Sequence, residues 1–350
     1  MIKIKVSPYA CKIGDQIAAD MFNQYGTLIV AENTIINEPI QKRLLSMSID
    51  DFWVIRTSQE MQFGHSDPQM EKFFESYKDN TKTLEKLIDN ICNNDQPDLN
   101  DLDKISNSIY SEITDCKYLV QFLCKIKNHD SYTFEHSLNV SFYCALICKW
   151  LNLSEIKTKN IIKAGLLHDI GKTKIPIELL NKKESLCEKE LERIRMHTIC
   201  GYNIVKDIIS MDSDIKLGVL LHHEREDGSG YPYRYSSKQL NINTKIISIA
   251  DTYDALTSER VYRNKYTPFI ALDILMKEGL TTYDINIMNA FINNLIFHYI
   301  GSKVLLSSSE IGTVVHIPMH DITRPIVIIE SKVVDLSKDD NRKIISILKE

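Results

Sequence analysis

The sequence predicts a mainly α-helical protein with a small α+β module at its N-terminal end and a short β-rich appendage at its C-terminal end. Between about residues 81 and 300, apolar side chains recur at three- and four-residue spacing, which is typical of amphipathic helices. Before residue 57 and after residue 301, short apolar runs separated by turn residues indicate strands. The chain has 350 residues, of which 43% are hydrophobic and 25% charged, and this suits a globular protein of two or three domains.

The predicted elements divide the chain into four segments. Residues 1–57 form the α+β module, and Asn37 and Pro39 begin its helix because a capping side chain followed by proline in the first turn is a helix start. Its strands are expected at 2–6, 26–30 and 52–55, and its helix at 40–47. Residues 58–103 are a linker and a helix, with the polar stretch 58–80 as the linker.

The central segment, residues 104–300, is a succession of helices with short breaks. They are expected at 102–126, 137–151, 157–168, 188–209, 215–223, 244–256 and 268–278. The period then changes to that of strands. The appendage, residues 301–350, has expected strands at 303–306, 312–317 and 325–330.

Charge and cysteine usage exclude several classes of protein. The net charge is −5 and the pI about 6.1, so bulk electrostatics support neither a nucleic acid polymer nor an anionic membrane as partner. No stretch approaches the ~18 apolar residues that a membrane-spanning helix needs, and the N-terminus lacks the apolar run of a signal peptide. The eight cysteines form no Cys-x-x-Cys pair. We expect a reduced, cytoplasmic protein.

Five histidines and two aspartates lie on different helices of the central segment. One histidine on an apolar helix is usually a satisfied core residue, and only the grouping favours metal ligands. Imidazole and carboxylate without thiolate suit Fe, Mn or Zn at a catalytic site. The seven are His136 in SYTFEHS, His168 and Asp169 in GLLHDIGK, His197 in RMHTICG, His222 and His223 in HHEREDGSGYP, and Asp251 in DTYDALTSER.

Seven ligands are too many for one ion and suit two, because a catalytic ion uses about three protein ligands. Asp169 directly follows His168, so its carboxylate can bridge two ions. His222 and His223 diverge by roughly 100° on a helix, so each can serve one ion. We therefore expect two divalent ions per chain, Fe or Mn first and Zn or others as alternatives. Two such ions roughly 3.5–4 Å apart hydrolyse phosphate esters, here with a bridging hydroxide as nucleophile.

The motifs LLHDIGK, HHEREDGSGYP and IADTYDALTSERVYR, with DSYTFEHS upstream, resemble the HD-GYP domain, a branch of the HD phosphohydrolases. The resemblance covers residues 104–300 and keeps the order of the family's motifs. It implies an HD-type all-helical catalytic domain around a metal centre. It also implies hydrolysis of cyclic di-GMP to linear pGpG, and in many members onward to GMP.

The resemblance assigns roles to residues. All seven His and Asp positions match the family's metal ligands, with Asp169 as the bridging one. Lys172 is similar to the lysine that contacts the scissile phosphate, where a cation suits the charge of the transition state. Arg260 and Arg263 match positions that approach the phosphates and guanine, and a planar guanidinium binds phosphate in two-pronged fashion. The alternative that these arginines form a solvated helix face stays open for Arg263.

The loop after the paired histidines is the expected recognition loop. Asp227 and Gly228 permit a sharp turn, and Gly230 allows close approach of the backbone to a ligand or a neighbouring loop. Tyr231 and Pro232 fix the exit of the loop. The family links it to substrate recognition and to diguanylate cyclase (GGDEF-type) partners. A purely structural role stays open, since Gly and Pro are first of all turn residues.

The sequence departs from part of the family at Tyr132. Some members have a Glu four residues before the first ligand histidine, and this Glu helps to hold a third metal. A phenol is a poor substitute for a carboxylate at a hard-ion site, so we expect a dinuclear centre. Such a centre favours pGpG as the end product.

Two alternatives to a cyclic di-GMP phosphodiesterase remain. The first is a hydrolase of another cyclic dinucleotide, such as cyclic GMP-AMP, because the residues themselves indicate only a phosphodiester and two metals. The second is a non-catalytic cyclic di-GMP receptor or scaffold. The filled ligand positions argue against the receptor. The helix near residues 81–92 could pair with a second copy to form a homodimer.

Overall fold

The computed structural model describes most of the chain, and contacts divide it into two compact units, Met1–Pro68 and Gln69–Leu348. Each unit is described by itself. The described residues are 2–6, 11, 15–22, 28–37, 39–40, 43–44, 52–56, 68–93, 97–114, 116–126, 132–182, 184–258 and 265–348.

The N-terminal unit contains two small antiparallel sheets. One sheet has the order β1-β5-β2 and the other pairs β3 with β4. Buried side chains such as Ile17, Ile36, Leu44 and Val54 form a separate core for this unit. Its strands are β1 (Ile2–Val6), β2 (Gln16–Ile17), β3 (Met21–Phe22), β4 (Leu28–Val30) and β5 (Phe52–Arg56). The expected α+β character therefore appears, while residues 41–42 and 45–47 of the expected helix lie outside the described residues.

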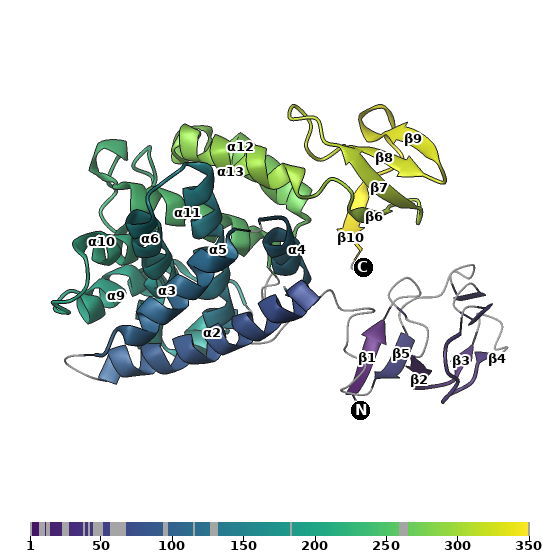
Figure 1. The fold of residues 1–350 in the computed structure, drawn as a ribbon, viewed down its shortest axis with the longest axis horizontal. Coiled ribbons are helices and arrows are strands. Elements are labelled where there is room, and N and C mark those ends of the chain that lie inside the picture. The colour runs from purple at the N-terminus through teal and green to yellow at the C-terminus, as the bar shows by residue number, and fades with distance from the viewer. Residues whose placement is uncertain are drawn as a thin grey trace. The chain divides into compact units, whose positions relative to one another are not determined.

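The second unit is a helical body with a small sheet at its C-terminal end (Figure 1). Its first half comprises α2 (Pro68–Asn93), α3 (Asn100–Glu112), α4 (Cys116–Ile126), α5 (Tyr132–Trp150) and α6 (Glu155–Leu167). A 3-10 helix η1 (Ile170–Lys174) leads into α7 (Ile177–Leu180), α8 (Glu188–Arg195) and α9 (His197–Val205). The remaining helices are α10 (Ser213–Leu221), α11 (Ile242–Thr257), α12 (Pro268–Thr282) and α13 (Ile285–Phe297), with η2 (Ser237–Gln239) before α11.

Helix α5 forms the centre of this body. Its residues from Leu138 to Cys148 are buried on every face, and it packs against α6, α11 and α13. A helix that is apolar all round belongs in a core, which is why this sequence lacks a polar stripe. His136 therefore reaches the interior from a helix that the surrounding packing holds in place.

The five-stranded C-terminal sheet has the order β10-β6-β7-β8-β9, and all neighbours are antiparallel. Val304, Val314 and Val327 on one of its faces join the same core cluster as the helices. Its strands are β6 (Lys303–Leu306), β7 (Ile311–His316), β8 (Ile326–Ile329), β9 (Lys332–Asp335) and β10 (Ile344–Ile347), with η3 (Leu336–Lys338) after β9. The domain boundaries expected at 103/104 and 300/301 stay predictions.

Helix α2 begins earlier than expected. The linker was expected to reach residue 80, but α2 starts at Pro68. Met70, Phe73 and Tyr77 continue the three- and four-residue spacing and are buried. The polar residues between them hide this stripe in the sequence, since only one side chain in three or four faces the core.

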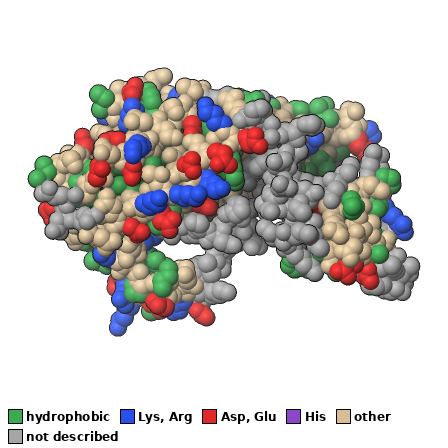
Figure 2. All heavy atoms as spheres, turned by 60° about the horizontal axis from the view of Figure 1, so that its bottom comes forward, with side chains coloured by type: hydrophobic (Ala, Val, Ile, Leu, Met, Phe, Trp, Pro, Cys, Tyr) green, Lys and Arg blue, Asp and Glu red, His purple; other side chains and the backbone are tan. Residues whose placement is uncertain are grey.

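The surface of the described residues carries charges of both signs. Figure 2 shows Lys and Arg side chains interspersed with Asp and Glu on the face that it presents. This mixture agrees with the modest net charge of −5. Among the described residues, no helix has both the length and the apolar character that crossing a bilayer requires.

Candidate metal centre

The structure brings all seven expected ligands together at the centre of the helical body. Six of them are buried, and His223 is partly exposed. They are His136 in α5, His168 at the end of α6, Asp169 just before η1, His197 at the start of α9, His222 and His223 directly after α10, and Asp251 in α11.

Side-chain ligand atoms form three groups, in each of which all atoms lie within 4.8 Å of one another. His136, His168 and Asp251 form one group. His197, His222 and His223 form another, and the third joins His168, Asp169 and His222. His222 thus belongs to two groups and shares one with His223, so the structure does not separate these two histidines between two ions.

Three histidines are oriented in the same way by the backbone. The Nδ1 atoms of His168, His197 and His222 lie 2.7, 2.7 and 2.9 Å from the carbonyl oxygens three residues earlier, at Gly165, Ile194 and Val219. Nδ1 must donate to a carbonyl, so Nε2 carries the lone pair in neutral imidazole. This fixed tautomer is the usual arrangement of a metal-binding histidine.

This orientation places two acceptor nitrogens close together, which is unfavourable when no cation lies between them. Nε2 of His197 lies 3.3 Å from Nε2 of His222. Both atoms are acceptors in this tautomer, so the pair needs a cation or a proton to be stable. Burial lowers the pKa of His197, and burial with neighbouring histidines lowers that of His222, so protonation is disfavoured. A metal ion satisfies both nitrogens.

Asp169 lies between the groups. Its Oδ2 atom is 3.3 Å from Nε2 of His168 and 3.6 Å from Nε2 of His136, and its Oδ1 atom is 3.4 Å from Nε2 of His197. Burial alone would raise the pKa of Asp169, but Lys172 and His168 hold it well below the usual range. Nζ of Lys172 is 2.6 Å from Oδ2. The carboxylate is therefore ionised and available as a ligand.

Asp254 contacts one of the expected ligands, and sequence reasoning did not single it out. Its Oδ2 atom lies 2.7 Å from Nδ1 of His136, and its side chain is fully buried. The opposite nitrogen of His136, Nε2, is 3.1 Å from Asp251. Burial lowers the pKa of His136, but hydrogen bonds to Asp251 and Asp254 outweigh it and raise the pKa to about 9. The spacing of Asp251 and Asp254, three residues on one helix, was the available signal.

The residues fit divalent metal ions. Nε2 of His168 and Oδ1 of Asp169 are buried and make no hydrogen bond among the described residues. A buried polar atom without a hydrogen-bond partner lowers the stability of the fold. A metal ion would give both of these atoms a partner. The donors are imidazole nitrogens and carboxylate oxygens, which suit Fe, Mn or Zn.

Gly171 of the HDIGK motif permits the close packing that forms the cluster. A Cβ atom at this position would lie 1.9 Å from the carbonyl oxygen of His197 and 2.4 Å from the nitrogen of Gly201. The backbone of η1 therefore rests directly on α9, and these two elements make extensive contact. This contact sets His168 and Asp169 against His197.

The break between α8 and α9 also serves the cluster. One helix was expected over 188–209, but α8 ends at Arg195 and α9 begins at His197. The helix ends at Val205, and residues 206–209 lie beyond it. No proline or glycine marks this break, so the residue pattern predicts one continuous helix. Packing of α9 against η1 accounts for the break that the residue pattern does not predict.

The recognition loop is held against the metal centre by Glu224, a second residue that sequence reasoning missed. Its buried carboxylate accepts hydrogen bonds from the backbone nitrogens of Tyr233 at 2.7 Å and Tyr235 at 3.0 Å. A Cβ atom on Gly230 would lie 2.4 Å from Cα of Glu224. The glycine is thus required for a close approach, which explains its place in the motif.

The start and end of the loop are also defined. Gly228 has φ +75°, a conformation that favours glycine, and Oδ1 of Asp227 accepts a hydrogen bond from the nitrogen of Ser229. The Tyr231–Pro232 peptide bond is cis. The Tyr231 ring stacks on the His223 ring with centroids 4.6 Å apart and an angle of 25°. Through Tyr231, the loop therefore contacts His223, one of the seven expected metal ligands.

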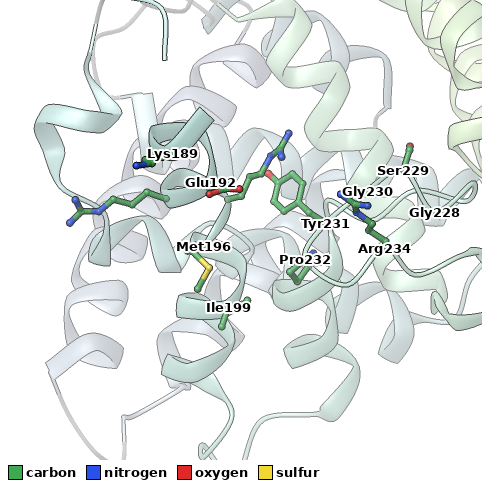
Figure 3. Close-up of a pocket in the computed structure, with 12 residues that line it drawn as sticks. Lys189, Glu192, Met196, Ile199, Gly228, Ser229, Gly230, Tyr231, Pro232 and Arg234 are labelled. Atoms are coloured by element: carbon green, nitrogen blue, oxygen red, sulfur yellow. The ribbon is translucent and has the colours of Figure 1, made fainter. Parts of the chain in front are cut away.

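Two cavities open beside the loop. One, of about 330 Å³, reaches His223 and is bordered by Arg225, Thr252 and Tyr283. The other, of about 700 Å³, lies between α8 and the loop, where Tyr231, Pro232 and Arg234 face Lys189, Glu192 and Met196 (Figure 3). Arg260, Arg263 and the side chain of Tyr132 lie outside the described residues, so their expected roles stay predictions.

Comparisons with known proteins agree with this geometry. A family model described as HD domain matches residues 123–287. A cyclic di-GMP phosphodiesterase from Pseudomonas aeruginosa is 31% identical over 192 residues, which are 55% of this chain and 46% of that protein. A 3′3′-cGAMP-specific phosphodiesterase from Vibrio cholerae is 34% identical over 147 residues, 42% of this chain and 34% of that protein. This chain thus spans about half or less of these relatives.

One solved structure is similar over most of the chain. It is Bd1817, an HDG“Y”P protein from Bdellovibrio bacteriovorus, with a TM-score of 0.56 and 16% identity, covering 84% of this chain and 99% of that one. At this identity the similarity supports the fold alone.

Proposed function

We propose that the protein is a metal-dependent phosphodiesterase that hydrolyses cyclic di-GMP to linear pGpG, since residues 123–287 match the family model of the HD domain. The observation that carries this proposal is the pair of ligand groups, His136–His168–Asp251 and His197–His222–His223, joined by Asp169. Such a donor set suits two divalent cations. When bound, these ions supply the positive charge and the activated water that phosphate ester hydrolysis needs.

We propose a role for each residue around this centre. Asp169 would hold both ions, and Asp251 would complete the group of His136. Asp254 orients His136 through its Nδ1 atom. Lys172, which lies at the edge of the centre with a side chain 24% exposed, stabilises the charge that develops on the scissile phosphate. Arg260 and Arg263 are proposed contacts of the nucleotide.

The metal count and the product are further parts of the proposal. We propose two ions per chain, Fe or Mn first, with Zn as an alternative. Tyr132 stands where some relatives have a third-metal Glu, and this supports a centre of two ions. A two-ion centre favours pGpG over GMP as the end product.

A second substrate is supported by the comparisons. The relative from Vibrio cholerae that is 34% identical acts on 3′3′-cGAMP. This substrate has the same two phosphodiesters and one different base, so the metal centre alone does not distinguish the two. A cyclic di-GMP receptor without activity is less well supported, because the seven ligand positions are filled and lie together.

Protein partners are proposals of a different kind. A GGDEF-type diguanylate cyclase is proposed to contact the recognition loop, whose Tyr233 and Asp227 are exposed. A homodimer through α2 would have to use its outer face, because Leu84, Leu87 and Ile88 are buried in the chain's own core. The cytoplasmic location stays a prediction.

The test is turnover with defined metal content. The protein is purified without air, its metals are quantified, and cyclic di-GMP and 3′3′-cGAMP are followed by chromatography. We expect about two ions per chain, pGpG as the product and a loss of turnover of about 100- to 1,000-fold or more in Asp169→Ala, the scale of losing transition-state charge stabilisation. Asp273→Ala, which removes a partly buried carboxylate of α12 that pairs with Lys277, is the control and should keep both metal and turnover. Bound metal without turnover of either dinucleotide would overturn the proposal.

A further inference from the structure

The two cavities beside the recognition loop share a wall. Arg195, Ser229, Gly230 and Tyr231 line both of them. The smaller cavity reaches His223 of the metal cluster, whereas the larger one opens between α8 and the loop (Figure 3). A ligand that lies over the metal centre and extends past Tyr231 must therefore pass Arg195.

The larger cavity is positively charged on an acidic protein. Its lining includes four cationic side chains, Lys189, Arg193, Arg195 and Arg234, and one carboxylate, Glu192. The whole chain has a net charge of −5. A concentration of cations around a concave surface attracts anions, and low-dielectric walls strengthen the attraction. Met196, Ile199 and Pro232 supply an apolar part of the lining.

Arg195 is the cation that joins this cavity to the metal centre. Its guanidinium lies over the Tyr231 ring, 5.3 Å from the centroid, and Tyr231 in turn stacks on His223. No described carboxylate forms an ion pair with Arg195, whereas other arginines of the chain, such as Arg324 and Arg342, have such partners. Contact with an aromatic ring orients a guanidinium and leaves its N–H groups available.

We propose that Arg195 binds the second, non-scissile phosphodiester of the cyclic dinucleotide. The inference rests on the proposed function, which places the scissile phosphodiester at the metal centre. A cyclic dinucleotide carries a second anionic phosphodiester across its ring, and this group needs its own positive partner. A guanidinium suits it, because its planar fork can donate two hydrogen bonds to phosphate oxygens.

The role predicts a specific kinetic effect. The charge on the non-scissile phosphate is the same in the ground state and in the transition state, so Arg195 stabilises both equally. Loss of such an interaction raises KM and leaves kcat nearly unchanged. A residue that merely holds Tyr231 and His223 in place would instead affect kcat and metal content.

The experiment compares two substrates in the metal-loaded protein. Cyclic di-GMP has two phosphodiesters, and bis(p-nitrophenyl) phosphate has one. For Arg195→Ala we expect KM for cyclic di-GMP to rise about 10- to 100-fold, the scale of one charge-assisted hydrogen bond, with kcat changed by less than about threefold. Its kcat/KM for bis(p-nitrophenyl) phosphate should change by less than about threefold, because this substrate has no second phosphate.

Two further variants sharpen the comparison. Arg193→Ala removes the same charge from the same helix, but Arg193 lines only the larger cavity, so we expect its KM to rise less than about fivefold, the range of one screened surface charge. Arg195→Lys keeps the charge without the planar fork. Its KM for cyclic di-GMP should therefore lie between those of wild type and Arg195→Ala.

The outcomes separate this inference from the proposed function. Suppose that wild type cleaves cyclic di-GMP. If Arg195→Ala then has the same KM as wild type, or if its kcat/KM falls equally for both substrates, the inference is wrong and the proposed function stands. If wild type prefers 3′3′-cGAMP, the same KM comparison applies to that substrate, which also has two phosphodiesters. If wild type cleaves only bis(p-nitrophenyl) phosphate, the proposed function is wrong and the second-phosphate site is wrong with it.

Discussion

Oδ2 of Asp254 lies 2.7 Å from Nδ1 of His136, on the side of the imidazole ring that faces away from Asp251. A carboxylate in this position fixes the ring and makes Nε2 a better metal ligand. Because Asp254 is fully buried, water cannot replace it.

We expect Asp254→Asn to weaken metal binding about 10- to 100-fold, the usual scale for such an outer partner. Titration of metal-free protein with Mn²⁺, followed by calorimetry, measures the effect. Asp273→Asn is the control, because the carboxylate of Asp273 is also partly buried but pairs with Lys277 on α12. Unchanged Mn²⁺ affinity in Asp254→Asn would show that Asp254 has no such role.

Gly171→Ala should disrupt the contact between η1 and α9. The new Cβ atom would lie within 2.4 Å of two backbone atoms, which cannot move aside as a side chain can. We expect the free energy of unfolding to fall by about 1–3 kcal/mol or more, as for overpacked cores. Chemical denaturation of metal-free protein measures it.

Gly165→Ala is the matched control for this substitution. There the nearest atom is Oγ of Ser141 at 2.9 Å, a side-chain atom, and the nearest backbone atom is Cα of Ser141 at 3.3 Å, much farther than the backbone atoms that Gly171 faces. Its loss of stability should be smaller than that of Gly171→Ala. The reverse order would contradict the packing described here.

The cysteines should differ sharply in their reactivity. Cys187 is exposed, whereas Cys144 and Cys148 are fully buried in α5. Burial raises the pKa of the Cys148 thiol to about 12 and that of Cys144 well above its usual value, so neither forms thiolate at pH 8. In native protein, iodoacetamide should label Cys187 at least 100-fold faster than Cys144 or Cys148, since only the thiolate reacts. Peptide mapping by mass spectrometry gives the rates, and comparable labelling of all three would refute the burial of α5.

The C-terminal sheet should depend on pH through Glu310. Hydrogen bonds from Arg342 and Ser308 lower the pKa of Glu310 to about 2. The folded pKa lies below the unfolded value of ~4.3. The stabilisation is therefore complete above pH ~4.3 and is lost as the pH falls towards 2.

Glu310→Gln tests this dependence. The variant should unfold at a lower temperature than wild type at pH 7, and the difference should shrink between pH ~4.5 and 2. Asp340→Asn is the control, because Asp340 is 95% exposed in its ion pair with Arg324 and such pairs contribute little. A difference that does not change with pH would exclude the ion pair as its cause.

The sequence was sufficient to predict which histidines and aspartates meet, and the reason is chemical. His168, Asp169, His222 and His223 end apolar helices, where a polar side chain has no structural reason to be buried. Asp254 was missed because it lies in the same run as Asp251, and nothing in the pattern ranks one carboxylate above the other. Only the nitrogen of His136 that each carboxylate contacts distinguishes them, and this residue lies 118 positions from Asp254 in the chain: Nδ1 faces Asp254 and Nε2 faces Asp251.

The fold was predictable where local pattern and packing agree. The mainly helical class and strand β6 at Lys303–Leu306 follow directly from the pattern. The start of α2 and the break at Met196 do not, because long-range packing determines both. Strands β9 and β10 were also missed: Lys332, Val333 and Ile345 are exposed, so the strands lack a clear apolar face.

The backbone carbonyls that orient the three histidines have a wider electrostatic meaning. His168 and His222 are the residues at which α6 and α10 end, and His197 follows the end of α8. Each helix dipole places about half a negative charge at its C-terminal end. The ends of α6 and α10 and the carboxylates of Asp169 and Asp251 converge on one buried volume, whereas the start of α9 at His197 opposes the end of α8. In the proposed function, the metal ions would offset this negative charge, and would thereby favour entry of the anionic substrate as well as activate water.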